Sequence, residues 1–194
     1  MLFILKKTAP LALAAVAALA ALGVGLRWLT PPDLPSLRFT PVIALMGLAA
    51  CGGVLVSDAL IHGTLCRAFG ERYRRLYHEL AGEFRGQGVA AMIAGAAMAG
   101  IGEELVFRGW STSLTILLPL AVSFGLLHHI RGRLWPFTLW SIWEGVLFAV
   151  ALWWTRELAV TMTAHFLHDL LGFVIFHMEN RRDGGKVTPR THIP

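Results

Sequence analysis

The chain has 194 residues, of which 56% are hydrophobic and 15% are charged, and its formal net charge is +5. A soluble domain usually carries about 25% charged residues, so this composition excludes an ordinary soluble enzyme and indicates a membrane protein. In a membrane protein, an excess of Lys and Arg reports topology and contact with anionic lipid, and we expect no nucleic-acid partner.

Six apolar segments follow one another along the chain. A helix needs about 20 mostly apolar residues to cross the hydrocarbon core of a bilayer. We therefore predict six transmembrane helices, over residues 8–26, 39–57, 88–108, 109–127, 134–155 and 158–176. No segment alternates with the period of two that a barrel requires, so the predicted fold is an all-α polytopic membrane helical bundle. The first segment also resembles a signal peptide, because an Ala18-Leu19-Ala20 sequence follows its apolar run, but we prefer a retained helix.

The basic residues predict the orientation of the chain. If the amino terminus is cytoplasmic, only Arg27, Arg38 and Arg156 lie in the loops on the far side. The cytoplasmic side then carries Lys6, Lys7, Arg67, Arg72, Arg74, Arg75, Arg85, Arg131, Arg133, Arg181, Arg182, Lys186 and Arg190. This bias follows the positive-inside rule and predicts an integral protein of a bacterial inner membrane with both termini in the cytoplasm.

Adjacent carboxylates stand inside the third predicted helix, where ionisable groups are costly and point to function. Glu104 and Arg108 are four residues apart, so they share a helix face and can form an ion pair. Glu103 points elsewhere and stays free to act as a general base on water. The alternative is a charge pair that only holds two helices together.

Histidines and an aspartate occupy the ends or interiors of two later helices. His128 ends the fourth predicted helix, and His165 and Asp169 lie four residues apart on one face of the sixth. His168 is three residues from His165 and can join this pair, although it sits off the main face. This set can hold a water and stabilise an oxyanion, as peptide hydrolysis requires, or it can bind a divalent metal such as zinc.

Three further ionisable residues are less easily assigned from the sequence. Asp58 and His62 lie beyond the predicted end of the second helix at residue 57, and we interpret them as interfacial. Glu144 lies in the middle of the fifth helix, where it can act as a partner of the site.

Three motifs give the chain its resemblance to a known family: EELVFRG at 103–109, FGLLH at 124–128 and HFLHD at 165–169. They resemble the EExxxR, FxxxH and HxxxN/D motifs of the CPBP family of CAAX-protease and bacteriocin-processing (Abi) membrane peptidases, which is related to the Ras-converting CAAX endopeptidase. The resemblance implies three regions. Residues 1–87 form two transmembrane helices and a cytoplasmic amphipathic segment, residues 88–176 form the catalytic helical core, and residues 177–194 form a polar cytoplasmic tail.

The resemblance also implies a role for each motif residue. Glu103 activates the attacking water, His128 helps to hold it, and Glu104 and Arg108 support the site. His165 and Asp169 stabilise the oxyanion or orient the substrate carbonyl. Family members have been described both as metal-dependent and as metal-free glutamic peptidases. We favour the metal-free reading with no bound cofactor; a zinc ion, if present, would lie between Glu103, His128 and His165.

The expected activity is endoproteolysis of a membrane-associated protein or peptide, through CAAX-type, bacteriocin-leader or carboxy-terminal sorting-signal processing. The alternatives are a membrane transporter or proton-relay protein, and a non-catalytic scaffold or immunity protein of the same fold. One geometric difficulty accompanies the peptidase reading. Glu103 falls in the outer half of its helix whereas His128 ends near the cytoplasm, so the third helix must start deeper, tilt, or break at Gly100 or Gly102.

Overall fold

The computed structural model describes residues 21, 34–83, 87–128 and 135–182. The predicted first helix, 8–26, therefore lies outside the described residues except at residue 21. The helices are α3 (Pro41–Phe69), α4 (Glu71–Glu83), α5 (Val89–Ala97), the π-helical segment η1 (Met98–Glu103), α6 (Glu104–Arg108), α7 (Leu114–Leu127), α8 (Trp135–Thr155) and α9 (Leu158–Arg182). The all-α prediction is confirmed.

Four described segments are long and apolar enough to cross a membrane. They are Pro41–Phe69, Val89–Arg108, Pro136–Thr155 and Leu158–Met178. Large apolar side chains such as Val42, Leu45 and Leu60 remain exposed on the outside of the bundle, as lipid contact requires. The chain is an integral membrane protein.

The predicted helix over 109–127 is wrong in its first part, since α7 begins only at Leu114. Its 14 residues span about 21 Å, less than the hydrocarbon core. The preceding Ser and Thr residues use their side chains in loop hydrogen bonds, which compete with helix formation. Ser111 accepts a hydrogen bond from the backbone N–H of Ser113 at 3.0 Å, and Arg156 donates to the Thr112 hydroxyl.

Helices α3 and α9 are both longer than predicted. Helix α3 begins at Pro41, where the Thr40 hydroxyl accepts a hydrogen bond from the backbone N–H of Ile43 at 3.3 Å, and it ends before Gly70. Its 29 residues run well past the predicted end at residue 57. Helix α9 continues to Arg182, so the segment after residue 176 begins as helix.

One end of the bundle is held by contacts between the start of α3 and the turn between α8 and α9. The backbone of Ser36 exchanges hydrogen bonds of 2.8 Å with Arg156 and Leu158. Arg38 Nε also donates to Glu157 Oε1 at 2.8 Å. Hydrogen bonding to the Arg38 guanidinium holds the pKa of the Glu157 carboxyl below its usual range.

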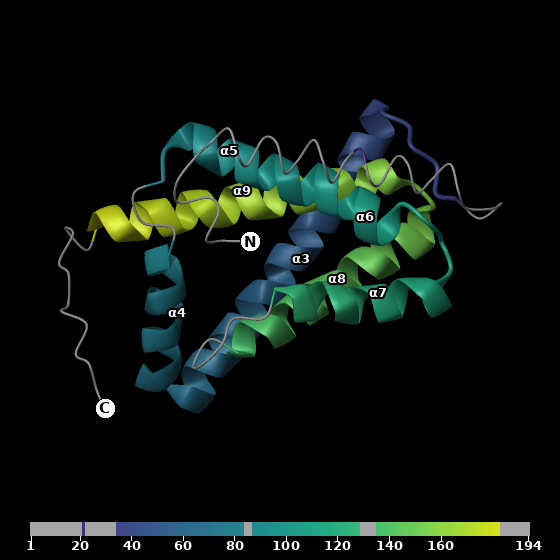
Figure 1. The fold of residues 1–194 in the computed structure, drawn as a ribbon. Coiled ribbons are helices and arrows are strands. Elements are labelled where there is room, and N and C mark those ends of the chain that lie inside the picture. The colour runs from purple at the N-terminus through teal and green to yellow at the C-terminus, as the bar shows by residue number, and fades with distance from the viewer. Residues whose placement is uncertain (1–20, 22–33, 84–86, 129–134, 183–194) are drawn as a thin grey trace.

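The arrangement of the helices is visible in Figure 1. Helices α5, η1 and α6 form one continuous rod that runs alongside α9 in the opposite direction, α7 and α8 form a hairpin, and α3 crosses behind α9. The predicted amphipathic helix is present as α4, which packs on α3 and α9. It buries Tyr73 and Ala81 and exposes Arg72, Arg74 and Arg75.

The rod and α9 lie close together at Gly100. A Cβ atom at this position would lie 2.5 Å from Cβ and 2.7 Å from Cα of Phe166. Gly100 and Gly102 both fall within the π-helical segment, so the helix does not break at these glycines but changes its hydrogen-bonding pattern there. Such π segments occur frequently at functional sites, and this one ends at Glu103.

Candidate active site

Glu104 and Arg108 form a buried ion pair at the end of the rod. Their exposed fractions are 0% and 2%, and Arg108 Nη1 donates to Glu104 Oε1. Arg108 Nη2 donates to the backbone oxygen of Gly145 in α8 at 3.2 Å. The guanidinium carbon also lies 5.2 and 5.3 Å from the ring centres of Phe124 and Phe148. The predicted pairing is confirmed, and it connects α6 to both α7 and α8.

Glu103 has a different environment from its neighbour. Its side chain lines a pocket, and the residue is only 3% exposed. Its Oε2 atom is buried and has no hydrogen-bond partner among the described residues. A buried polar atom without a partner is costly, so this carboxylate oxygen is available to a water or a substrate group in the pocket.

His128 follows the last residue of α7 and faces Glu103. Its Nδ1 atom lies 2.8 Å from the backbone oxygen of Phe124. A carbonyl oxygen only accepts, so Nδ1 carries the proton of this hydrogen bond. His128 Nε2 lies 3.8 Å from Glu103 Oε2, which is too long for a direct hydrogen bond and short enough for one water to contact both.

His165 is held against the buried ion pair. Its Nδ1 donates to Glu104 Oε1 at 2.8 Å, because that carboxylate is already fixed as an acceptor by Arg108. Its ring stacks on Phe148 with centres 4.7 Å apart. The Nε2 atom lies 3.8 Å from Asp169 Oδ1, so the predicted shared face is confirmed and Nε2 is the atom left for chemistry.

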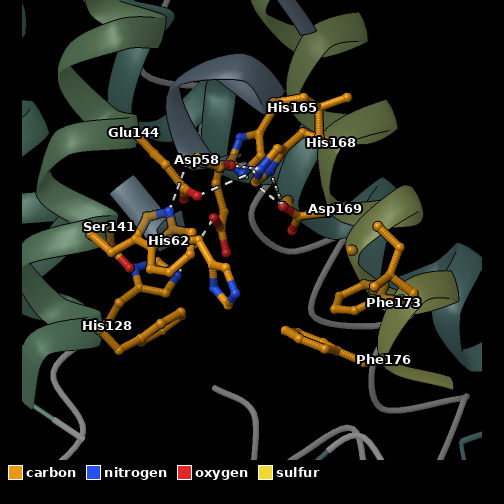
Figure 2. Close-up of a pocket in the computed structure, with 18 of the residues that line it drawn as sticks. Asp58, His62, His128, Ser141, Glu144, His165, His168, Asp169, Phe173 and Phe176 are labelled. Carbon is orange, nitrogen blue, oxygen red and sulfur yellow. Dashed lines mark hydrogen bonds and ion pairs between the residues drawn. The ribbon is translucent and has the colours of Figure 1, made fainter. Parts of the chain in front are cut away.

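The pocket has a volume of about 380 Å³ and brings Glu103, His128, His165 and Asp169 together. Glu104 and Arg108 lie behind these residues and do not line it. Figure 2 shows His128, His165 and Asp169 pointing into one space. Aromatic and apolar side chains form much of the remaining wall, including Phe124, Phe137, Phe173, Ile175 and Phe176.

A second group of ionisable side chains lies in the same pocket, and the sequence interpretation missed it. Asp58 was predicted to be interfacial, and this was wrong. Its Oδ1 accepts from Trp140 Nε1 at 2.9 Å, and its Oδ2 lies 2.7 Å from His168 Nε2. Because these partners satisfy Asp58 inside the protein, α3 continues through it. His168 also belongs to the pocket, and Glu144 Oε1 lies 3.5 Å from its Nε2.

A signal for this group was present in the sequence. The apolar run Ala59-Leu60-Ile61 continues directly after Asp58, which is typical of a helix that has not yet left the membrane. His62 lies one turn further on and lines the pocket as well. Its ring contacts Tyr73 of α4, with Nδ1 3.2 Å from the phenol oxygen.

The described residues include one group of three whose ligand atoms lie within 4.8 Å of one another: Asp58, Glu144 and His168. It contains none of the three predicted metal ligands. Both oxygens of Asp58 already have partners in Trp140 and His168, so we interpret this group as a hydrogen-bond network.

The fold and the pocket define an all-α integral membrane protein with carboxylates and histidines gathered inside the helix bundle. Comparison with family models gives one finding: residues 85–171 match the family described as type II CAAX prenyl endopeptidase Rce1-like. Neither the comparison with curated proteins nor that with solved structures gave a match. This match spans all three motifs and confirms the resemblance to the CAAX-protease family that they carry.

Proposed function

We propose that the protein is an intramembrane endopeptidase in which Glu103 activates a water for attack on a peptide bond of a membrane-associated substrate. The supporting observation is the pair formed by Glu103 Oε2 and His128 Nε2. The carboxylate oxygen is buried and has no hydrogen-bond partner in the described residues, the imidazole nitrogen carries a lone pair, and 3.8 Å separates the two atoms. One water between these atoms can donate one proton to each of them.

The reaction then needs a base, an electrophile activator and a proton donor. Glu103 accepts a proton from the water while the water oxygen attacks the carbonyl carbon of the substrate. This attack forms a tetrahedral oxyanion. His165 already donates from Nδ1 to Glu104, so it acts here as an imidazolium cation that also donates from Nε2 to the oxyanion, and Asp169 orients the ring. Glu103 returns the proton to the leaving nitrogen as the C–N bond breaks. Glu104 and Arg108 hold His165 in place.

A zinc ion fits the same residues chemically, since a metal-ligating histidine usually donates its other N–H to an acceptor such as a carboxylate or a backbone carbonyl. His165 donates to Glu104 and His128 donates to the Phe124 carbonyl. Glu103, His128 and His165 would hold the ion, which when bound supplies Lewis-acid activation of water and carbonyl. We favour the glutamic mechanism because Glu103 and His128 already provide both acceptors that the water needs.

The pocket wall supports a lipid-linked or strongly apolar peptide as the substrate. Phe137, Phe173 and Phe176 line the pocket, and apolar walls favour apolar ligands. The family description names CAAX prenyl endopeptidases, so a prenylated CAAX-type peptide is the first substrate to test. Bacteriocin leaders and carboxy-terminal sorting signals are the other two classes. We further propose a bacterial inner-membrane location with cytoplasmic termini.

The test compares Glu103→Gln with wild-type protein, both purified in detergent, on a prenylated CAAX-type reporter peptide. Loss of a general base lowers the rate by about 10²–10⁴. Glu71→Gln is the matched control, because Glu71 is exposed on α4 and lies outside the pocket. Wild-type cleavage by Glu103→Gln would refute the assigned base.

Chelation separates the two mechanisms. A glutamic peptidase keeps its rate with a strong chelator, whereas a metal enzyme loses activity and regains it with Zn²⁺. Absence of cleavage with all three substrate classes, together with proton flux in vesicles, would replace the peptidase by the proton-relay alternative.

A further inference from the structure

His168 lies at the centre of a network of carboxylates, and the proposed peptidase reaction gives it no role. It faces one carboxylate from each of three helices: Asp58 of α3, Glu144 of α8 and Asp169 of α9. Figure 2 shows the ring between these side chains, with dashed lines to its neighbours. The side chains of Asp58 and His168 are each 13% exposed, so the network lies largely out of contact with bulk water.

The two ring nitrogens of His168 have different carboxylate partners. Nε2 lies 2.7 Å from Asp58 Oδ2, and Nδ1 lies 3.2 Å from Asp169 Oδ1. An ionised carboxylate only accepts hydrogen bonds, so a ring that serves both partners donates from both nitrogens. An imidazole that donates from both nitrogens is a cation, and Asp58 is the nearer of its two partners.

Asp169 connects this network to the proposed reaction, because it lies next to both His168 and His165. Its Oδ1 atom lies 3.2 Å from His168 Nδ1 and 3.8 Å from His165 Nε2. A bare carboxylate here would repel the negative charge that develops on the substrate oxygen beside His165. A hydrogen bond from the His168 cation offsets part of this negative charge, although the cation is shared with Asp58, and it fixes the orientation of the Asp169 carboxylate.

We propose that His168, held by Asp58, is a positioning residue that fixes Asp169 and offsets part of its negative charge while the oxyanion forms. The inference rests on the proposed peptidase function and extends it to Asp58, outside the three motifs, and to His168, a position that the HxxxN/D pattern leaves unspecified. It has a specific consequence. A neutral side chain of the same shape at position 169 needs no compensating cation, so Asp169→Asn removes the dependence on His168.

The experiment is a double-mutant cycle on cleavage of the prenylated CAAX-type reporter. It uses wild type, His168→Gln, Asp169→Asn and the double variant, with Glu103→Gln as the inactive reference. We expect His168→Gln to lower kcat by on the order of 10², the effect of losing one oxyanion-stabilising group, with little change in KM. In the Asp169→Asn background the same substitution should change kcat by less than about threefold. His78→Gln, exposed on α4, is the histidine control.

A second variant keeps the test decisive if His168→Gln does not fold. Asp58→Asn retains an oxygen for the Trp140 hydrogen bond and removes the charge that holds the second proton on His168. Its loss of kcat should likewise disappear in the Asp169→Asn background. A purely structural His168 would lower membrane levels and activity equally in both backgrounds, which would overturn the inference. A wild-type protein that cleaves no reporter would overturn the proposed function, and this inference with it.

Discussion

Gly100→Ala tests whether the close approach of η1 and α9 sets the position of the catalytic carboxylate. The added methyl would lie 2.5 Å from Cβ and 2.7 Å from Cα and N of Phe166. Backbone atoms of a packed helix cannot rotate away, and carbon atoms are comfortable at about 3.5–4.0 Å. The two helices must therefore separate by about 1 Å, and overpacking of this kind costs about 1–3 kcal/mol.

Glu103 is three residues further along the same rod, so it moves with this separation. A displacement of about 1 Å of a catalytic group can lower the rate about 10²-fold. We expect Gly100→Ala to insert into membranes, to unfold at a lower temperature, and to cleave the reporter about 10²-fold more slowly. Gly53→Ala is the matched control, since nothing lies within 4 Å of its added methyl. Cleavage at the wild-type rate by Gly100→Ala would refute this account of the site.

The other predictions concern stability, pH and topology. Arg108→Ala should destabilise the protein by about 3–5 kcal/mol, because it leaves Glu104 buried without its cation. Arg72→Ala, at an exposed position, is the control. Equal unfolding temperatures for the two variants would contradict this prediction. Pairing with Arg38 lowers the pKa of Glu157 in the folded protein. The stabilisation of the fold by this ion pair is therefore complete above the unfolded-state pKa of about 4.3, and it is lost as the pH falls through the lower pKa of the folded state. The difference in Tm between wild type and Arg38→Gln should therefore shrink at acid pH, and a constant difference would count against the pair. Reporters fused after Arg85 and after Arg190 should both read cytoplasmic, and a periplasmic signal from either would refute the proposed orientation.

The sequence was informative where spacing alone determines geometry. Residues four apart on a helix share a face, so the pairs Glu104–Arg108 and His165–Asp169 were predictable and are present. The helical class followed from the length and composition of the apolar segments. The expected irregularity in the third helix followed from a mismatch in depth, and the structure has a π-helical segment at that place.

Contacts between helices far apart in the chain were not predictable from spacing. Asp58 and His168 are separated by 110 residues, and each has a plausible interpretation alone. Asp58 follows an uncharged stretch of about 20 residues, which is the usual length of a span, so the helix seemed complete before it. The late start of α7, at Leu114 and not at residue 109, was missed for a related reason. Ser and Thr residues are uncharged, so they do not interrupt an uncharged segment, although their side chains favour a loop.

The roles of the four acidic side chains follow from their partners, because the groups themselves are chemically alike. Glu104 is held by Arg108 and His165, and both oxygens of Asp58 have donors. Asp169 shares one oxygen with His168. Glu103 and Glu104 each keep one buried oxygen without a hydrogen-bond partner among the described residues. Of these two residues only Glu103 lines the pocket, so only its unpaired oxygen can reach a water that attacks a substrate there. The assignment of Glu103 as the base therefore depends on two observations together, an unpaired carboxylate oxygen and a place in the pocket wall.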